Sequence, residues 1–333
     1  MAGLLSGLFF GLGAPVSKLL LRGTGPLLLA GLLYLGAAAA FVLVRRSRTE
    51  ASLRRQDVPI LAAAVLCGAG LGPPLMLWGL TRVSGLTGSL LLNLEAPFTM
   101  AMAVLLFREH LSRRELAAGA LVVLGGALIG ARGQVSGSIA GAAAIALACL
   151  CWAIDNNLNA RLALKDPVQL LRIKAVCAGT LNLAVGFAAG ERMGTARAVT
   201  GALALGTVSY GASFLLYLRA QRALGAARQA ALFGIAPFAG AALAVPLLGD
   251  RPGLLEAAAA ALMAVGVAVL IEARHSHVHT HEALEHEHAH VHDEHHRHAH
   301  EGPVVEPHSH PHRHASLTHD HPHVSDAHHH HKH

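Results

Sequence analysis

The chain has 333 residues, of which 53% are hydrophobic and 14% charged, and it carries a formal net charge of +6. Soluble domains are about 25% charged, so this composition excludes a soluble globular enzyme and indicates an integral membrane protein. The charge is unevenly divided, because residues 1–274 carry +12 whereas residues 275–333 carry −6 with neutral histidine. Of the 25 histidines, 24 lie in that second part. We therefore predict a membrane region followed by a soluble, histidine-rich tail.

Ten stretches are long and apolar enough to be transmembrane helices, which need about 20 mostly apolar residues. In chain order they are residues 2–21, 26–44, 58–80, 86–107, 115–131, 138–160, 168–190, 199–219, 226–247 and 253–272. The first is interpreted as a span rather than a signal peptide, because it lacks a basic start and more spans follow it. The sequence thus predicts an all-α membrane protein with ten transmembrane helices.

The positive charges of the loops predict how these helices are oriented. Loops after even-numbered spans hold 14 Lys and Arg residues, counting Arg274 after the last span, whereas loops after odd-numbered spans hold six. Cytoplasmic loops are the ones enriched in Lys and Arg. We therefore expect a multi-pass protein of the cell inner (plasma) membrane, with both termini and the histidine-rich tail in the cytoplasm.

The two halves of the membrane region resemble each other. At an offset of 140 residues, residues 80–98 align with residues 220–238 without gaps and share an arginine, a glycine and a Pro-Phe pair. Each repeat would hold five spans, and an odd number places the second repeat upside down relative to the first. Inverted repeats are a transporter architecture. The predicted parts are a five-helix repeat at 1–133, a second at 134–274, and a disordered cytoplasmic tail at 275–333.

Two stretches also resemble a known family. Residues 85–129, beginning GLTGSLLLNLEAPFTMAM, and residues 223–271, beginning ALGAARQAALFGIAPFAG, are similar to the two repeats of EamA-type transporters of the drug/metabolite transporter superfamily. The shared pattern is a Pro-aromatic step, an apolar run that ends in an acidic-basic corner, and a final helix containing glycine. Phe10 stands where the family often has Trp, and Asp250 where Glu is usual. The resemblance covers about residues 1–274 and implies ten helices, both termini inside and export of small molecules, without fixing a substrate.

Ionisable side chains within a span are costly in lipid and mark candidate functional sites. Glu95 lies near the middle of the fourth span, two residues before Pro97. The proline leaves a backbone carbonyl near Asn93 without its helical hydrogen bond, and such a break is tolerated where it faces protein or water. We therefore expect Asn93, Glu95 and Pro97 to line a substrate path. The alternative is a buried, neutral acid that serves packing alone.

Asp155 on the sixth span and Lys174 on the seventh form the second candidate group. Asp155 lies ten residues before the hairpin near Lys165 and Lys174 lies nine after it, so both should reach a similar depth on antiparallel helices. We expect an ion pair within the membrane. Because a buried pair often adds nothing to stability, a gate or coupling site competes with a structural role. The same span adds three polar candidates, Asn156, Asn157 and Asn159.

The tail repeats histidine at every second position. In an extended chain alternate residues point the same way, so each run would line one face with imidazoles, which bind transition metals such as Zn, Ni, Co or Cu. The candidate ligands are His275, His277, His279, His281, His286, His288, His290, His292, His308, His310, His312, His314, His319, His321 and His323. With few bulky apolar residues, the tail is expected to be disordered without metal. A purification tag, a pH sensor and a passive metal buffer are the alternatives.

Together these features predict a secondary transporter rather than an enzyme, namely an exporter that works by alternating access. The first candidate cargo is a transition metal (nickel, cobalt or zinc) that the tail captures or senses. The alternative is export of a small organic metabolite or amino acid, with the tail as a metal buffer or regulator. A metal-storage protein anchored by its spans is a third interpretation. The expected partners are the lipid bilayer and the substrate, with no nucleic acid, no required cofactor beyond tail-bound metal, and a homodimer left open.

Overall fold

The computed structural model describes residues 1–42, 44, 51–107, 111–131, 139–162, 165–224, 229, 232–272, 275–281, 285–290, 308–313 and 317–323. These ranges include most of every predicted span. Two of the expected tail ligands, His292 and His314, lie outside the described residues.

The first half of the described membrane region begins with α1 (Ala2–Gly11), α2 (Gly13–Leu20) and α3 (Pro26–Val42). A 3-10 turn, η1 (Arg55–Asp57), leads into α4 (Val58–Ala64), the π-helix η2 (Val65–Leu71) and α5 (Gly72–Leu80), which form one continuous rod. The next rod consists of α6 (Gly85–Leu91), the 3-10 turn η3 (Leu92–Leu94) and α7 (Glu95–Phe107), and α8 (Arg113–Ala131) completes this half.

The second half follows the same plan. It contains α10 (Ile139–Ala160) and α11 (Pro167–Ala188), then a rod made of α12 (Ala196–Leu205), the π-helix η4 (Gly206–Ala212) and α13 (Ser213–Leu224). It ends with α15 (Ala236–Leu248) and α16 (Leu254–Glu272). α15 stops at Gly249, whose φ of 72° is the left-handed conformation that glycine adopts readily at a helix end.

Within the described residues, seven helical stretches are long and apolar enough to cross a membrane. Two more, α3 and α15, are apolar but shorter, at 17 and 13 residues. α8 has 19 residues but begins with Arg113, Arg114 and Glu115. The chain is thus a multi-pass helical membrane protein, and the count of ten spans stays a prediction.

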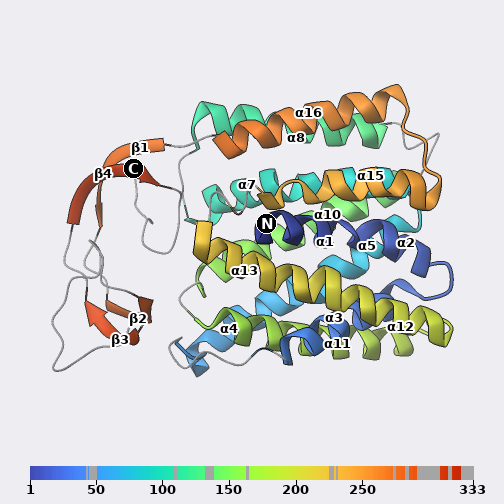
Figure 1. The fold of residues 1–333 in the computed structure, drawn as a ribbon, viewed down its shortest axis with the longest axis horizontal. Coiled ribbons are helices and arrows are strands. Elements are labelled where there is room, and N and C mark those ends of the chain that lie inside the picture. Colours follow the sequence, from blue (N-terminus) through green and yellow to red (C-terminus); the bar gives the residue numbers. More distant parts are fainter. Residues whose placement is uncertain are drawn as a thin grey trace.

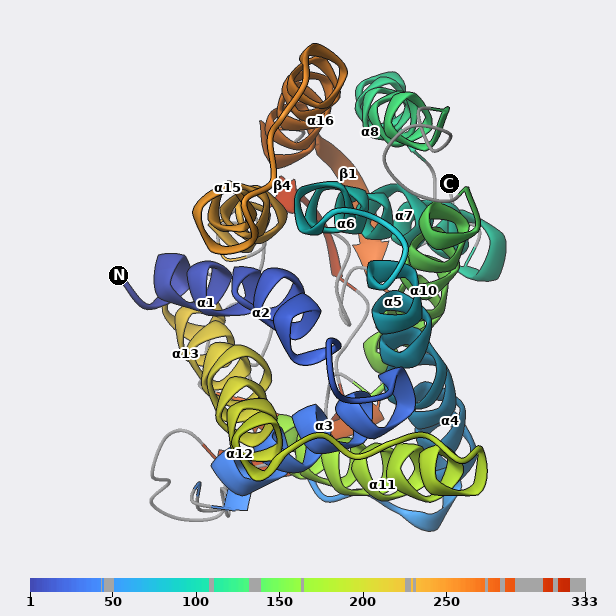
Figure 2. The same cartoon turned by 90° about the vertical axis from the view of Figure 1, so that its right-hand side faces the viewer.

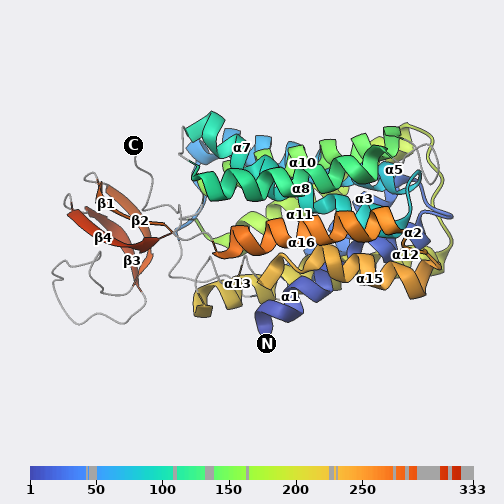
Figure 3. The same ribbon diagram turned by 90° about the horizontal axis from the view of Figure 1, so that it is seen from above.

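The helices run side by side along one direction (Figures 1 and 3). Seen end-on, they surround a common axis, with α1 and α13 on one side and α7 and α10 on the other, while α8 and α16 lie together outside the ring (Figure 2). α3 packs against α11, α6 against α15, and α8 against α16. Each of these three contacts joins a helix of the first half to one of the second.

The elements of the two halves recur at a constant spacing. The starts of α3 and α11 are residues 26 and 167, those of η2 and η4 residues 65 and 206, and those of α7 and α15 residues 95 and 236, so that each pair is 141 residues apart. The packing recurs as well, because α1 packs against α13 and α15 just as α10 packs against α5 and α7. The two halves are therefore built from the same series of elements.

Prolines account for two of the helix breaks, because proline has no backbone N–H to donate. Pro15 leaves the carbonyl of Gly11 without its helical donor, and α1 ends at that glycine. Pro73 does the same to the carbonyl of Ala69 within η2. There Nδ2 of Asn182 on α11 replaces the missing donor, at 2.9 Å from the Ala69 oxygen. The π-helix is thereby tied to the seventh span.

The described residues of the tail form four short strands. β1 (His275–His281) pairs antiparallel with β4 (Leu317–His323), and β2 (Glu285–His290) pairs antiparallel with β3 (His308–Arg313). The alternating sequence is compatible with these strands, because a period of two suits an extended chain. The register places histidine opposite histidine in the pairs His275–His323, His277–His321, His279–His319, His286–His312, His288–His310 and His290–His308.

Candidate substrate path

A break in the fourth span shapes the candidate site. α6 tightens into the 3-10 turn η3 before α7 begins at Glu95. Pro97 cannot donate to the carbonyl of Asn93, which weakens the regular helix at this point. Asn93 is buried, and its amide donates to the carbonyl of Leu90 at 2.9 Å. Asn93 therefore stabilises the break from within the helix.

Glu95 and Asn156 meet across two helices. Nδ2 of Asn156 on α10 donates to Oε1 of Glu95 on α7 at 2.8 Å. The hydroxyl of Thr99 lies 3.4 Å from the same amide nitrogen and donates to the backbone carbonyl of Glu95 at 2.8 Å. Asn156 is exposed and Glu95 is half-buried. An acid and an amide within apolar helices are costly in lipid. The Glu95–Asn156 pair is therefore the polar surface on which the candidate path is centred.

The predicted ion pair between Asp155 and Lys174 is present. Nζ of Lys174 on α11 lies 2.6 Å from each carboxylate oxygen of Asp155 on α10. Nδ2 of Asn159, one turn further along α10, donates to Oδ1 of Asp155 at 3.0 Å. Both charged side chains are buried. Since a buried charge is tolerated only with a close partner, each of the two depends on the other.

The π-helix η2 packs directly behind this ion pair. A Cβ added at Gly68 would overlap the carboxyl group of Asp155, so glycine is what allows the close approach. The Gly68 carbonyl accepts from Nε1 of Trp152 at 2.8 Å and from the hydroxyl of Tyr34 at 3.3 Å. Helices from four spans, the second, third, sixth and seventh, therefore meet around Gly68. Such π-helical turns are rare and are often found at functional sites.

Replacing Gly68 by alanine tests this packing. Gly68→Ala is expected to lower the free energy of unfolding by about 1–3 kcal/mol, because the added methyl group would displace the Asp155 carboxylate from Lys174. Gly70→Ala in the same π-helix is the control, since its added Cβ would meet nothing closer than the Val65 oxygen at 3.4 Å. Thermal unfolding of both variants in detergent makes the comparison. Equal midpoints for the two would show that η2 does not press on the ion pair.

The remaining candidates are buried between the helices. Asn157 is buried, and its amide donates to the carbonyls of Thr99 and Ala153 at 3.1 and 2.8 Å, which joins α10 to α7. Pro97 is buried within α7. The structure thus brings the candidates together in two groups, one made of Glu95 and Asn156 and the other of Asp155, Asn159 and Lys174, whereas Asn93, Asn157 and Pro97 lie within the helix contacts.

A cluster of aromatic side chains near this site did not emerge from the sequence. Phe10 contacts three of the other rings, and the members are Phe10, Tyr34, Tyr210, Phe214, Tyr217 and Phe233. They come from α1, α3, η4, α13 and the segment before α15. No spacing along the chain could have revealed the cluster, because its members are brought together only by the packing of separate spans.

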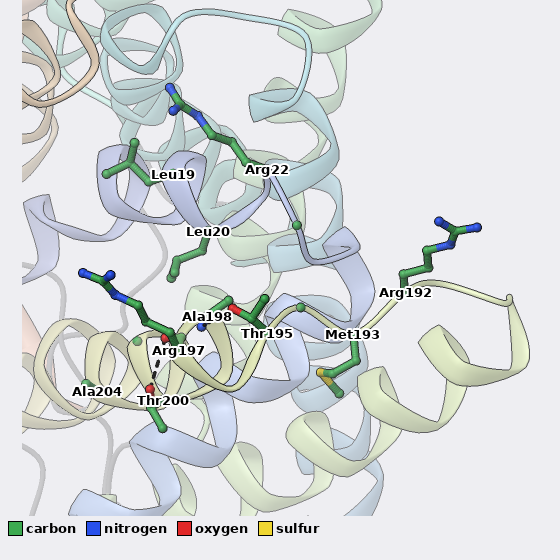
Figure 4. Close-up of a pocket in the computed structure, with 13 residues that line it drawn as sticks. Leu19, Leu20, Arg22, Arg192, Met193, Thr195, Arg197, Ala198, Thr200 and Ala204 are labelled. Atoms are coloured by element: carbon green, nitrogen blue, oxygen red, sulfur yellow. Dashed lines mark hydrogen bonds between the residues drawn. The ribbon is translucent and has the colours of Figure 1, made fainter.

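A further pocket lies between α2 and α12, at the end of the bundle away from the tail strands (Figures 1 and 4). Its volume is about 930 Å³, and its lining includes Leu20, Arg22, Arg192, Arg197 and Thr200. The side chains of the three arginines extend in different directions (Figure 4). The residues of the candidate path do not line this pocket, so it is separate from the Glu95 surface.

Comparison with known proteins identifies the family. A model described as the EamA-like transporter family matches residues 1–131 and, in a second copy, residues 139–272. The chain belongs to the EamA-like transporter family. An "uncharacterized transporter" of Methanothermobacter thermautotrophicus is 25% identical over 270 residues, which are 75% of this chain and 79% of that protein. The chain is therefore a membrane transporter.

The EamA-like match covers the helical region and does not extend into the tail. One solved crystal structure aligns with a TM-score of 0.57 over 80% of this chain and 94% of the other, at 18% identity, and this similarity shows a shared fold alone. Among the described residues, no group of three or more His, Cys, Asp or Glu side chains could hold a metal ion. Metal binding by the tail of this EamA-like transporter stays a prediction.

Proposed function

We propose that this EamA-like transporter is an exporter that works by alternating access, with its substrate passing the Glu95–Asn156 pair. The observation that carries the proposal is the hydrogen bond of 2.8 Å between the half-buried Glu95 and the exposed Asn156, both within apolar helices. Polar groups at such a depth are costly in lipid and are retained where they serve a substrate or an ion.

In this proposal the halves at 1–133 and 134–274 are inverted five-helix repeats of a ten-span bundle. Support comes from the 141-residue spacing of their elements and from the contacts that recur between them. Inverted repeats rock against each other around a central site, and this motion would open Glu95 first to one side and then to the other. With the more positive loops inside, both termini and the tail face the cytoplasm of the inner membrane.

The Asp155–Lys174 pair is assigned to a gate or coupling role. Asp155 and Asn156 are neighbours on α10, and they contact different spans, the seventh and the fourth. A movement of α10 that breaks one contact would therefore strain the other. This arrangement suits a switch that links the ion pair to the polar surface of the path.

A transition metal is the first of the two candidate cargoes, with a small organic metabolite or amino acid as the alternative, and the register of the tail strands supports the metal. Six cross-strand positions place histidine opposite histidine. Directly opposed residues are the nearest neighbours across a pair of antiparallel strands. The tail would then collect Zn, Ni, Co or Cu, either for transport or as a buffer beside the transporter.

Uptake into everted membrane vesicles tests these proposals. Labelled nickel, cobalt, zinc and amino acids are offered to the full chain, to a chain ending at Arg274 and to Glu95→Gln. Because hydrogen bonds to a charged group contribute about 1.5–3 kcal/mol, Glu95→Gln is expected to lower transport of the true substrate about ten-fold or more. Glu115→Gln is the matched control, since Glu115 is an acid in the first turn of α8 whose carboxylate accepts from the backbone N–H of Ser112 at 2.8 Å.

The arms of this experiment separate the two cargoes. Metal uptake that depends on Glu95 and falls in the chain ending at Arg274 supports the metal cargo. Uptake of an amino acid without any metal contradicts the metal cargo and supports the organic one. If Glu95→Gln and Glu115→Gln transport every substrate equally well, the path is wrong.

A further inference from the structure

The tight turn between α5 and α6 is held from two sides. On one side Nζ of Lys18 on α2 donates to the carbonyls of Leu80 and Val83, at 2.6 and 2.5 Å. Leu80 is the last residue of α5, and basic side chains often bind the last carbonyls of a helix in this way. On the other side Oδ2 of Asp250, in the segment between α15 and α16, accepts from the backbone N–H of Leu86 at 2.8 Å. Lys18 and Asp250 thus bind the two ends of the same turn.

The contact through Asp250 joins the two halves of the chain, because Asp250 belongs to the second half and α6 to the first. α6 also packs against α15. A Cβ added at Gly85 would lie 3.4 Å from the Cβ of Ala244, and one added at Gly240 would lie 3.0 Å from the hydroxyl oxygen of Ser89. That hydroxyl is buried and has no hydrogen-bond partner in the part of the chain that the structure describes. α6 and α15 are therefore in close contact beside the turn.

The turn lies at the end of the bundle away from the tail strands (Figure 1), and Figure 2 looks onto this end. The loops after the third and ninth predicted spans meet here, and loops after odd-numbered spans are the less positive ones. The orientation proposed above therefore places this end outside the membrane. The pocket between α2 and α12 lies at the same end, but its lining residues do not belong to α5, α6 or α15. The pocket thus leaves the contact between α6 and α15 intact.

α6 connects the turn to the candidate path. It has seven residues, all of them buried, and it ends where the 3-10 turn η3 begins. Pro97 cannot donate to the carbonyl of Asn93 within η3, which weakens the regular helix there. α7 then begins at Glu95. A movement of α6 away from α15 would therefore bend the fourth span at η3, directly before Glu95.

We infer that Lys18 and Asp250 are positioning residues that keep the outer end of the path closed by holding α6 against α15. We call their contacts with the α5–α6 turn and with Leu86 the outer latch. The latch acts through α6 and does not touch the substrate. When the bond from Leu86 to Asp250 breaks, α6 is free to turn about η3. This inference rests on the proposed alternating access and goes beyond it by naming the contact that must open.

Glu191, in the segment after α11, provides a matched control at the same end. Its carboxylate oxygens accept from the backbone N–H groups of Leu27 and Leu28, at the start of α3, at 3.2 and 3.0 Å. This contact likewise joins an acid of the second half to a helix of the first. However, α3 is tied to α11 at its other end as well, because Arg172 on α11 donates to the carbonyl of Phe41 at 2.8 Å. We expect these two helices to move together, so loss of the Glu191 contact should not open the path.

Labelling of a cysteine at position 89 tests the inference. Ser89 is 1% exposed, and Ser89→Cys replaces only its hydroxyl by a thiol. A charged, membrane-impermeant methanethiosulfonate is added outside intact cells, and labelling is counted above that of the four native cysteines. Asp250→Ala and Lys18→Met are each expected to raise the labelling rate about ten-fold, the effect of losing a hydrogen bond to a charged group. Glu191→Ala should leave the rate unchanged.

Cross-linking of α6 to α15 gives a second measurement that does not depend on position 89. Gly85→Cys combined with Ala244→Cys should form a disulfide on mild oxidation, since their Cβ separation of 3.4 Å is close to the usual range of about 3.5–4.5 Å. Adding Asp250→Ala should slow disulfide formation about ten-fold, whereas adding Glu191→Ala should not. Thermal unfolding in detergent shows that each variant compared is folded.

Equal labelling and equal cross-linking in the parent and in Asp250→Ala would overturn the inference. Equal rises in Asp250→Ala and Glu191→Ala would overturn it too, because they would report lost stability rather than opening. If Asp250→Ala opens the outer end while Glu95→Gln transports like the parent, the proposed path is wrong and the latch stands. Glu95-dependent transport without any effect of Asp250→Ala on labelling or cross-linking would have the opposite meaning.

Discussion

Lys174→Met is expected to lower the free energy of unfolding by about 3–5 kcal/mol, the cost of leaving one partner of a buried ion pair alone. The change removes both contacts of 2.6 Å to Asp155. It leaves the carboxylate with the amide of Asn159, at 3.0 Å, as its remaining described donor. Methionine has a similar length and apolar stem, so packing accounts for little of the loss. Unfolding of the purified protein in detergent measures the effect.

A double variant distinguishes the effect of the ion pair on stability from its effect on transport. Asp155→Asn combined with Lys174→Met removes both charges of the pair, so most of the lost stability should return. If the pair acts as a gate or coupling site, the double variant should fold but transport poorly. Parental transport by a stable double variant would make the pair purely structural. A double variant no more stable than Lys174→Met would contradict the account of the stability loss.

Gly206→Ala is expected to lower the free energy of unfolding by about 2–3 kcal/mol, in the upper range for overpacking. A Cβ added at Gly206 would overlap the backbone carbonyl of Leu33, and one added at Gly36 would overlap the carbonyl of Leu203. Backbone atoms cannot rotate away as a side chain can, so α3 and η4 would have to separate. These elements belong to different halves of the chain, and the change would therefore loosen the contact between the halves.

Gly130→Ala supplies the control for this prediction. A Cβ added at Gly130 would have nothing within 4 Å. Gly130 lies within α8, where alanine is favoured over glycine by about 1 kcal/mol. Gly130→Ala should therefore be as stable as the parent or more stable. Equal unfolding midpoints for Gly206→Ala and Gly130→Ala would contradict the close contact between α3 and η4.

Hydropathy, together with the number of residues that separate a side chain from a helical hairpin, predicted the parts of the fold that depend on local sequence. The seventh span was expected at residues 168–190 and is found at Pro167–Ala188. Its neighbour across the hairpin is α10. Asp155 and Lys174 lie at similar distances from the turn along the chain, which predicted that the two side chains would meet. The alignment of the halves at an offset of 140 residues lies one residue from the observed spacing of their elements. The ninth span was predicted at residues 226–247, whereas α15 has 13 residues, Ala236–Leu248.

The sequence by itself determined that this is a multi-pass membrane transporter of the EamA-like family, with acidic and amide side chains in its spans and a histidine-rich tail. Only the tertiary structure decided that Glu95 pairs with Asn156, that Gly68 lies against Asp155, and that six aromatic rings form one cluster. The physical reason is that spans such as α3 and α16 are apolar all round, so no polar stripe tells which face of the helix points inward. Close contacts at glycines on neighbouring spans fix the rotation of each helix about its axis. The residues brought together in this way lie far apart along the chain.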